Sequence, residues 1–132
     1  MSRRIDDLTK ETQEKSYKFA GKMAETGIPF MLTSTYRSQA EQDALWRIGR
    51  TEPGVKVTWT KKSRHTGRTA FDIAILNDGQ PVWDEKVNVN MNDEMDYVEA
   101  GHIAEALNLV WGGRFRDEKG KPRPDFCHFE LK

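Results

Sequence analysis

Residues 70–75, Ala-Phe-Asp-Ile-Ala-Ile, constrain the fold more than any other part of the chain. Side chains alternate between the two faces of a strand, so the three large apolar side chains share one face. Ala70, Asp72 and Ala74 then share the other face. The pattern predicts a strand that carries one carboxylate, Asp72, in its middle among small residues.

Helical and strand patterns interleave along the rest of the chain without a repeated βαβ unit. Helices are predicted at 6–25, 39–48 and 94–109, and strands at 30–35, 70–75, 82–83 and 125–131. This order favours the α+β class, with helices packed on a small, mostly antiparallel sheet and a metal site at one edge. No repeat or linker divides residues 1–132, so we expect one domain.

Two of the predicted helices have identifiable faces. Ser38 and Glu41 have the spacing of a capping box at the start of helix 39–48, whose Ala44, Leu45 and Ile48 should face the core. The apolar face of helix 94–109 comprises Met95, Val98, Ala106 and Leu109, and His102 falls on the same face. We expect His102 to be a core or helix-surface residue and not a metal ligand.

The composition is that of one folded domain with a single core. The chain has 132 residues, 36% of them hydrophobic, and one cysteine, which excludes an internal disulfide. It contains neither an apolar run long enough for a membrane span nor an apolar segment typical of a signal peptide. We therefore expect a monomer that is synthesised in the cytoplasm.

Charge is balanced overall, with 21 basic and 21 acidic residues, but it is unevenly distributed. Residues 47–68 hold seven Lys or Arg and one Glu, in a long irregular segment of the kind that often carries function. The simplest explanation of this uneven charge is that the charged segments form solvated faces of the protein. A remote alternative is a non-enzymatic nucleic-acid-binding module, in which this segment contacts phosphates while Trp46 and Trp59 stack on bases.

Histidines indicate where chemistry could occur. His65 precedes Asp72 by seven residues, and His128 follows Asp125 by three. Two imidazoles and one carboxylate form a ligand set suited to catalytic Zn²⁺, which keeps a fourth position open for water. By spacing alone, this reading competes with ordinary structural roles for each residue.

Several motifs together resemble the zinc peptidases that act on bacterial cell-wall peptides. Ser63-x-His65 with Ala70-x-Asp72, Asp125-x-x-His128-x-Glu130, and Tyr36-Arg37-Ser38 with Gln42 and Leu45 occur in that family's order. The family includes D-alanyl-D-alanine carboxypeptidases and dipeptidases, and the L-alanyl-D-glutamate endopeptidases that serve as phage endolysins. Trp111-Gly112-Gly113 resembles the segment before the last motif in the endopeptidase branch.

The resemblance implies a role for each matching residue. His65, Asp72 and His128 would be zinc ligands, Asp125 the catalytic carboxylate, and Arg37 the arginine that binds substrate and stabilises the transition state. Ser63 and Trp111 would contact substrate. The chain departs from the family at Arg68, where members usually have glycine; here the glycine comes one residue earlier, at Gly67.

The implied function is zinc-dependent cleavage of the peptidoglycan stem peptide, foremost at the L-alanyl-D-glutamate bond. An endolysin made in the host cytoplasm would reach the wall after the membrane is breached, without a separate wall-binding domain. A D-alanyl-D-alanine carboxypeptidase or dipeptidase is the alternative, and a zinc-bound fold that has lost catalysis is a third reading.

Other residues outside the implied ligand set also have structural readings. Glu130 could serve as the base in place of Asp125, or could orient a ligand histidine from behind. Cys127 should point away from His128 as a small buried side chain. The four tryptophans are mostly core candidates, with Trp111 the best placed to line a cleft.

Overall fold

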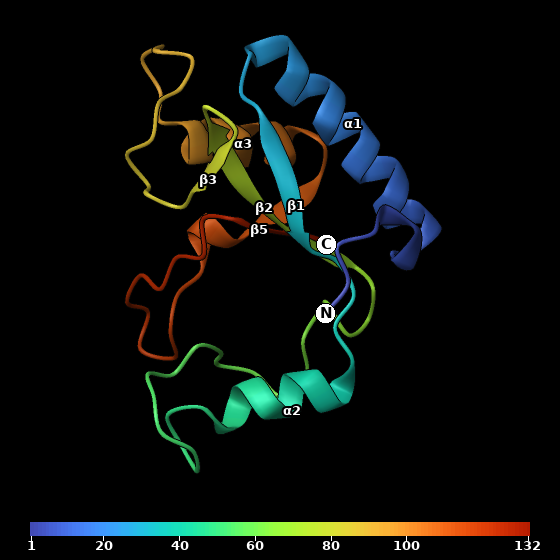
Figure 1. The fold of residues 1–132 in the computed structure, drawn as a ribbon, viewed down its shortest axis with the longest axis vertical. Helices are drawn as coiled ribbons and strands as arrows, with labels where there is room; N and C mark the ends of the chain where they lie inside the picture. The colour runs from blue at the N-terminus through green and yellow to red at the C-terminus, as the bar shows by residue number, and fades with distance from the viewer.

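An antiparallel sheet of five strands forms the centre of the protein, in a computed structural model that describes residues 1–132 (Figure 1). Its strands are β1 (Phe30–Ser34), β2 (Ala70–Asn77), β3 (Gln80–Val82), β4 (Leu109–Trp111) and β5 (His128–Leu131). The order is β1-β2-β5-β4, and β3 pairs with the end of β2 that β5 does not reach. β2 is therefore the strand around which the sheet is organised.

Two of the three α-helices pack against this sheet and each other. They are α1 (Lys10–Thr26) and α3 (Asp96–Ala106), while α2 (Gln39–Arg47) lies at the opposite end of the molecule (Figure 1). Short 3-10 turns occupy Ile5–Asp7 and Gly112–Arg114. The predicted α+β class, with helices on a small antiparallel sheet, is confirmed. No helix has both the length and the apolar character that crossing a membrane requires.

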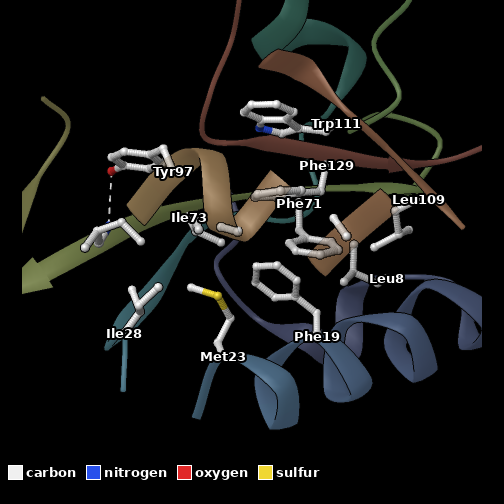
Figure 2. Close-up of a cluster of buried hydrophobic side chains, with 13 residues drawn as sticks. Leu8, Phe19, Met23, Ile28, Phe71, Ile73, Tyr97, Leu109, Trp111 and Phe129 are labelled. Atoms are coloured by element: carbon white, nitrogen blue, oxygen red, sulfur yellow. Dashed lines mark hydrogen bonds between the residues drawn. The ribbon is translucent and has the colours of Figure 1, made fainter. Parts of the chain in front are cut away.

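Aromatic side chains fill the core between α1 and the sheet (Figure 2). Phe19 of α1 meets Phe71 of β2 edge-on, with ring centroids 5.7 Å apart, and Phe71 stacks on Phe129 of β5 at 5.4 Å. All three rings are fully buried. Tyr97 of α3 adds a polar anchor, because its hydroxyl accepts a hydrogen bond from the backbone N–H of Ile75 at 3.1 Å. The predicted apolar face of β2 therefore forms the middle of the core.

The predicted ends of two helices need correction. α1 begins at Lys10 and not near Asp6, because the Thr9 hydroxyl caps it by accepting from the Thr12 N–H. α3 ends at Ala106, where Asn108 adopts a left-handed conformation and turns the chain into β4. The buried face of α3 is also rotated from the prediction, since Tyr97 is buried whereas Met95 is 42% exposed.

Helix α2 has the predicted capping box but not the predicted packing. The Ser38 hydroxyl accepts from the Glu41 N–H, and the Glu41 carboxylate accepts from the Ser38 N–H. Ala44, Leu45 and Ile48 are only half-buried and lie outside the main core, so the expectation that they face it is wrong. The one fully buried side chain of α2 is polar, that of Gln42.

Among the four tryptophans only Trp111 is buried, which corrects the expectation that most are in the core. Trp59 and Trp83 are 48% and 59% exposed. The Trp111 indole lies between Gly101 of α3 and Gly113, and its Nε1–H donates to the Phe126 carbonyl at 2.9 Å. A Cβ atom at either glycine would approach the ring to 2.2 Å.

This contact predicts opposite outcomes for two helix glycines. Gly101→Ala should destabilise the fold by about 1–3 kcal/mol, because the added methyl group overlaps the buried Trp111 ring. Gly21→Ala, on the exposed face of α1 with no atom near the added methyl, should stabilise it by about 1 kcal/mol. Urea unfolding measures both changes. Equal effects of the two substitutions would contradict the packing described for Trp111.

Candidate metal centre

Three predicted ligands converge from separate segments of the chain. Asp72 of β2 and His128 of β5 are direct partners in the antiparallel register, and His65 comes from the long segment before β2. One ligand atom from each lies within 4.8 Å of the others. Cross-strand partners project on the same side of a sheet, so the strand pairing itself brings Asp72 and His128 together.

His65 is fixed in one orientation. Its side chain is almost completely buried, and its Nδ1 lies 3.0 Å from the Thr35 carbonyl oxygen. A carbonyl can only accept, so Nδ1 carries the proton and donates. The other ring nitrogen, Nε2, faces Asp72 Oδ1 at 3.2 Å. Nε2 is therefore the atom that His65 offers to a metal.

His128 is held by a carboxylate on each side of its ring. Its Nδ1 lies 3.0 Å from Asp72 Oδ1, and its Nε2 lies 2.8 Å from Glu130 Oε1. Arg64 Nε donates to the other Glu130 oxygen at 3.0 Å. A carboxylate behind a ligand imidazole fixes its orientation and raises its basicity. This geometry favours the reading of Glu130 as an orienting residue over its reading as a base.

The carboxylates and imidazoles of the site shift one another's pKa values. Burial acts to raise the pKa of Asp72, but hydrogen bonds from His128 and His65 outweigh it and hold that pKa below its usual value. Burial acts to lower the pKa of His128, yet Asp72 and Glu130 raise it to about 9. The pKa of Asp125 is raised, first by loss of water in the cleft and then by the charge of Asp72. A raised pKa suits a carboxylate that must exchange protons.

The donor set fits a metal ion. Two imidazole nitrogens and one carboxylate oxygen are the ligands that divalent transition metals take in open catalytic sites. The backbone carbonyl behind His65 and Glu130 behind His128 supply the outer hydrogen bonds that such ligands usually have. The cluster of His65, Asp72 and His128 could therefore hold one metal ion.

The cluster opens into a cleft of about 750 Å³. Arg37, Ser63 and Asp125 line this cleft together with the three predicted ligands, so six of the seven residues singled out in the sequence meet there. Trp111 does not line it, which corrects the prediction that this residue contacts substrate. Its ring packs in the core, in the space that Gly101 and Gly113 leave by having no side chain.

A buried amide that the sequence analysis left without a role links the two walls of the cleft. Gln42 Oε1 accepts a hydrogen bond from Arg37 Nη1 at 2.8 Å. Its Nε2 donates to the Thr60 carbonyl at 2.6 Å and to the Thr58 hydroxyl at 3.1 Å. Gln42 thus fixes both the Arg37 guanidinium and the segment opposite it. The available signal was the motif that placed Gln42 five residues after Arg37, which did not indicate what the amide contacts.

Comparison with known proteins agrees with this geometry. The family model described as D-alanyl-D-alanine carboxypeptidase matches residues 56–131, which is more than half of the chain. The chain belongs to the D-alanyl-D-alanine carboxypeptidase family. The peptidoglycan L-alanyl-D-glutamate endopeptidase CwlK of Bacillus subtilis (strain 168) is 35% identical over 111 residues, which are 82% of this chain. The chain spans 64% of the length of that curated relative.

Solved structures share the fold at low sequence identity. The L-Ala D-Glu endopeptidase ChiX of Serratia marcescens has a TM-score of 0.67 at 19% identity, covering 97% of this chain and 83% of its own. The vancomycin-resistance D,D-dipeptidase VanXYg has a TM-score of 0.65 at 16% identity, covering 94% of this chain and 50% of its own. The fold of this D-alanyl-D-alanine carboxypeptidase family member therefore also occurs in an L-Ala D-Glu endopeptidase and in a D,D-dipeptidase.

The departure from the family pattern at Arg68 has a structural explanation. Arg68 adopts a left-handed conformation with φ 62°, whereas Gly67 does not, so the position where members usually have glycine does need that conformation. A non-glycine residue there costs about 1–2 kcal/mol. The Arg68 guanidinium offsets this by stacking 3.9 Å from the Tyr36 ring centroid and donating to the Asp7 carbonyl. The Arg68 side chain lies outside the cleft lining.

Cys127 is near the site through an unexpected contact. It packs against the core as predicted, but its Sγ lies 3.4 Å from Asp125 Oδ1. β5 begins only at His128, so the alternation expected from Asp125 onward does not apply to Cys127. His102, by contrast, lies on the exposed surface of α3 and pairs with Glu94, away from the cluster.

Removal of the Gln42 amide should loosen the cleft wall without disturbing the sheet. Gln42→Ala leaves Arg37 and the Thr60 carbonyl without their buried partner, which should destabilise the protein by about 1–3 kcal/mol. Tryptic cleavage after the neighbouring Lys61 should become faster. Ala40→Ser, exposed on the same helix, is the control and should leave the cleavage rate unchanged. Unaltered cleavage in Gln42→Ala would contradict the linking role of the amide.

Proposed function

We propose that this protein is a zinc-dependent peptidase that cleaves the peptidoglycan stem peptide, foremost at the L-alanyl-D-glutamate bond. The observation that carries this proposal is the meeting of His65, Asp72 and His128 with Arg37 and Asp125 in one cleft. The similarity to CwlK, a protein named for this bond, supports the choice of substrate. Membership of the carboxypeptidase family supports hydrolysis of a peptide bond.

His65 Nε2, His128 Nδ1 and the Asp72 carboxylate would hold the zinc ion. Zinc supplies Lewis-acid chemistry, polarising the scissile carbonyl and lowering the pKa of a water molecule towards about 7. Thr35 and Glu130 keep the two imidazoles oriented through their other ring nitrogens. The ligands need little rearrangement, because strand pairing and these hydrogen bonds already position them.

Asp125 and Arg37 would perform the remaining work of the reaction. The Asp125 carboxylate would take a proton from the attacking water and deliver it to the leaving amine, a transfer favoured by its raised pKa. The Arg37 guanidinium, fixed by Gln42, would stabilise the negative charge that develops on the carbonyl oxygen. Ser63, whose hydroxyl accepts from the His65 N–H at 3.1 Å, would contact substrate at the same end of the cleft.

Removal of the carboxy-terminal D-alanine, or cleavage of the D-alanyl-D-alanine dipeptide, is the second candidate function. Membership of the D-alanyl-D-alanine carboxypeptidase family and the shared fold of VanXYg favour it. Both reactions use the same ligands, so the cleft and not the metal would decide between them. The single domain of residues 1–132, the monomeric state and action on the wall after membrane breach stay predictions.

Zinc binding should depend on the buried imidazole of His65 and not on the exposed imidazole of His102. Wild-type protein should bind about one zinc ion per chain in equilibrium dialysis, and His65→Ala should bind close to none. His102→Ala, at the surface of α3, is the matched control and should bind as wild type does. Undiminished zinc binding by His65→Ala would show that the ion is held elsewhere.

Arg37 should affect turnover but not the metal. Arg37→Ala should retain full zinc content and lose about 10²–10³-fold in kcat, because the donor lost acts on charge that develops in the transition state. Metal analysis and steady-state kinetics on a stem peptide measure the two quantities. If Arg37→Ala kept most of its activity, the assignment would be wrong.

Mass spectrometry of digested peptidoglycan tests the function itself. Chelator-sensitive products with a new amino-terminal D-glutamyl residue would support the endopeptidase. Release of terminal D-alanine would support the carboxypeptidase instead. An absence of cleavage on several wall types, with zinc bound, would contradict both.

A further inference from the structure

More basic than acidic side chains line the cleft. Five Arg or Lys residues line it against three carboxylates, although the whole chain is neutral. Two of the five are engaged, Arg64 with Glu130 and Arg37 with Gln42. The others, Lys62, Arg116 and Arg123, form no salt bridge with any residue of the chain. Arg116 Nη1 donates to the Gly120 carbonyl at 2.7 Å, whereas the charged groups of Lys62 and Arg123 are fully available to an anionic ligand.

Arg123 is the best positioned of these three cations. Its backbone N–H donates to the Phe115 carbonyl at 2.8 Å, and the segment between these residues is closed by a hydrogen bond from Asp117 to Lys121. The Phe115 ring packs 5.6 Å from the His128 ring, so this hairpin-like segment is attached directly to the metal cluster. The turn holds two carboxylates: that of Asp117 accepts from the backbone N–H groups of Lys119 and Lys121, and that of Glu118 forms no salt bridge with Arg123.

A tryptophan from another segment of the cleft lining holds the Arg123 side chain. The guanidinium carbon lies 4.8 Å from the centroid of the Trp59 ring. Trp59 belongs to the segment between α2 and β2, and Arg123 to the segment between β4 and β5. A guanidinium stacked on an indole keeps its in-plane N–H groups free for bidentate binding of a carboxylate. No side-chain N–H of Arg123 donates within the protein.

We propose that Arg123, assisted by Lys62 and Arg116, binds a free carboxylate of the stem peptide, so that the enzyme discriminates against amidated stem peptides. This inference rests on the proposed function and names the substrate class within it. A D-glutamyl residue linked through its γ-carboxyl keeps a free α-carboxylate beside the L-alanyl bond. A diaminopimelate residue that follows carries a second free carboxylate. Either group offers the chemistry that Arg123 is arranged to bind.

Three synthetic stem peptides distinguish these carboxylates. One is unamidated, one has an α-carboxamide on D-glutamate, and one has an amidated diaminopimelate. The wild-type kcat/KM should fall about tenfold or more with one of the two amidations, because a charge-assisted pair is lost. The amidation that causes the fall identifies the carboxylate that is bound.

Substitution of Arg123 should abolish this discrimination. Arg123→Gln should lower kcat/KM for the unamidated peptide by about the same factor. On the peptide whose amidation slows the wild-type enzyme, Arg123→Gln should have the same kcat/KM as wild type. Lys119→Gln removes a positive charge from the same segment outside the cleft and should behave as wild type. Zinc content should be equal in all three proteins. Equal wild-type rates on the three peptides, or discrimination that persists in Arg123→Gln, would overturn the proposal.

A binding measurement separates this proposal from the proposed function. If wild-type protein cleaves none of the peptides, the proposed function fails, and calorimetric titration of the zinc-loaded protein with the same peptides still tests recognition. Tighter binding of the unamidated peptide that disappears in Arg123→Gln would support a carboxylate site without catalysis. Equal affinities, or no binding, would overturn the carboxylate site as well.

Discussion

The carboxylate of Asp72 is the point on which the site depends, because both imidazoles of the cluster face it. A carboxylate in the middle of a buried strand is costly unless it is paired, and here hydrogen bonds from His65 and His128 compensate the burial. The pairing also fixes the register of β2 with β5, since a slip of one residue would turn Asp72 into the core and Phe71 or Ile73 into the cleft. The register of β2 with β5 therefore also sets the positions of Asp72 and His128 as ligands.

The site is assembled from two parts that differ in how they are held. The sheet carries Asp72 and His128 on paired strands over an aromatic core, which makes the metal ligands the rigid part. Arg37 and the segment around Thr60 are linked instead by the amide of Gln42, on a helix remote from that core, and Gln39 and Arg50 add hydrogen bonds to the same segment. We infer that metal binding and substrate contact are separable, so that changes in the cleft wall alter specificity while the ligands stay in place.

Much of this organisation could be predicted from the sequence, and the failures have physical causes. The strand at residues 70–75 and the capping box at Ser38 follow from local periodicity and short spacings, whereas the ligand set was predicted from the resemblance of several motifs to a known family. The packing of α2 could not be predicted, because periodicity shows which residues share a face and not what covers that face. Trp111 was placed wrongly since its position depends on two glycines, one of them on α3, that only the folded chain brings beside it. The role of Gln42 depends on partners up to eighteen residues away.

The most direct test of this account is a crystal structure of the zinc-loaded protein with anomalous diffraction measured at the zinc absorption edge. The account predicts one strong anomalous peak about 2.0–2.2 Å from His65 Nε2, His128 Nδ1 and an Asp72 carboxylate oxygen. Glu130 should remain behind His128 without contacting the ion. A zinc peak at other residues, or a peak that His128 approaches through Nε2 with Glu130 displaced, would contradict the arrangement from which the proposed chemistry follows.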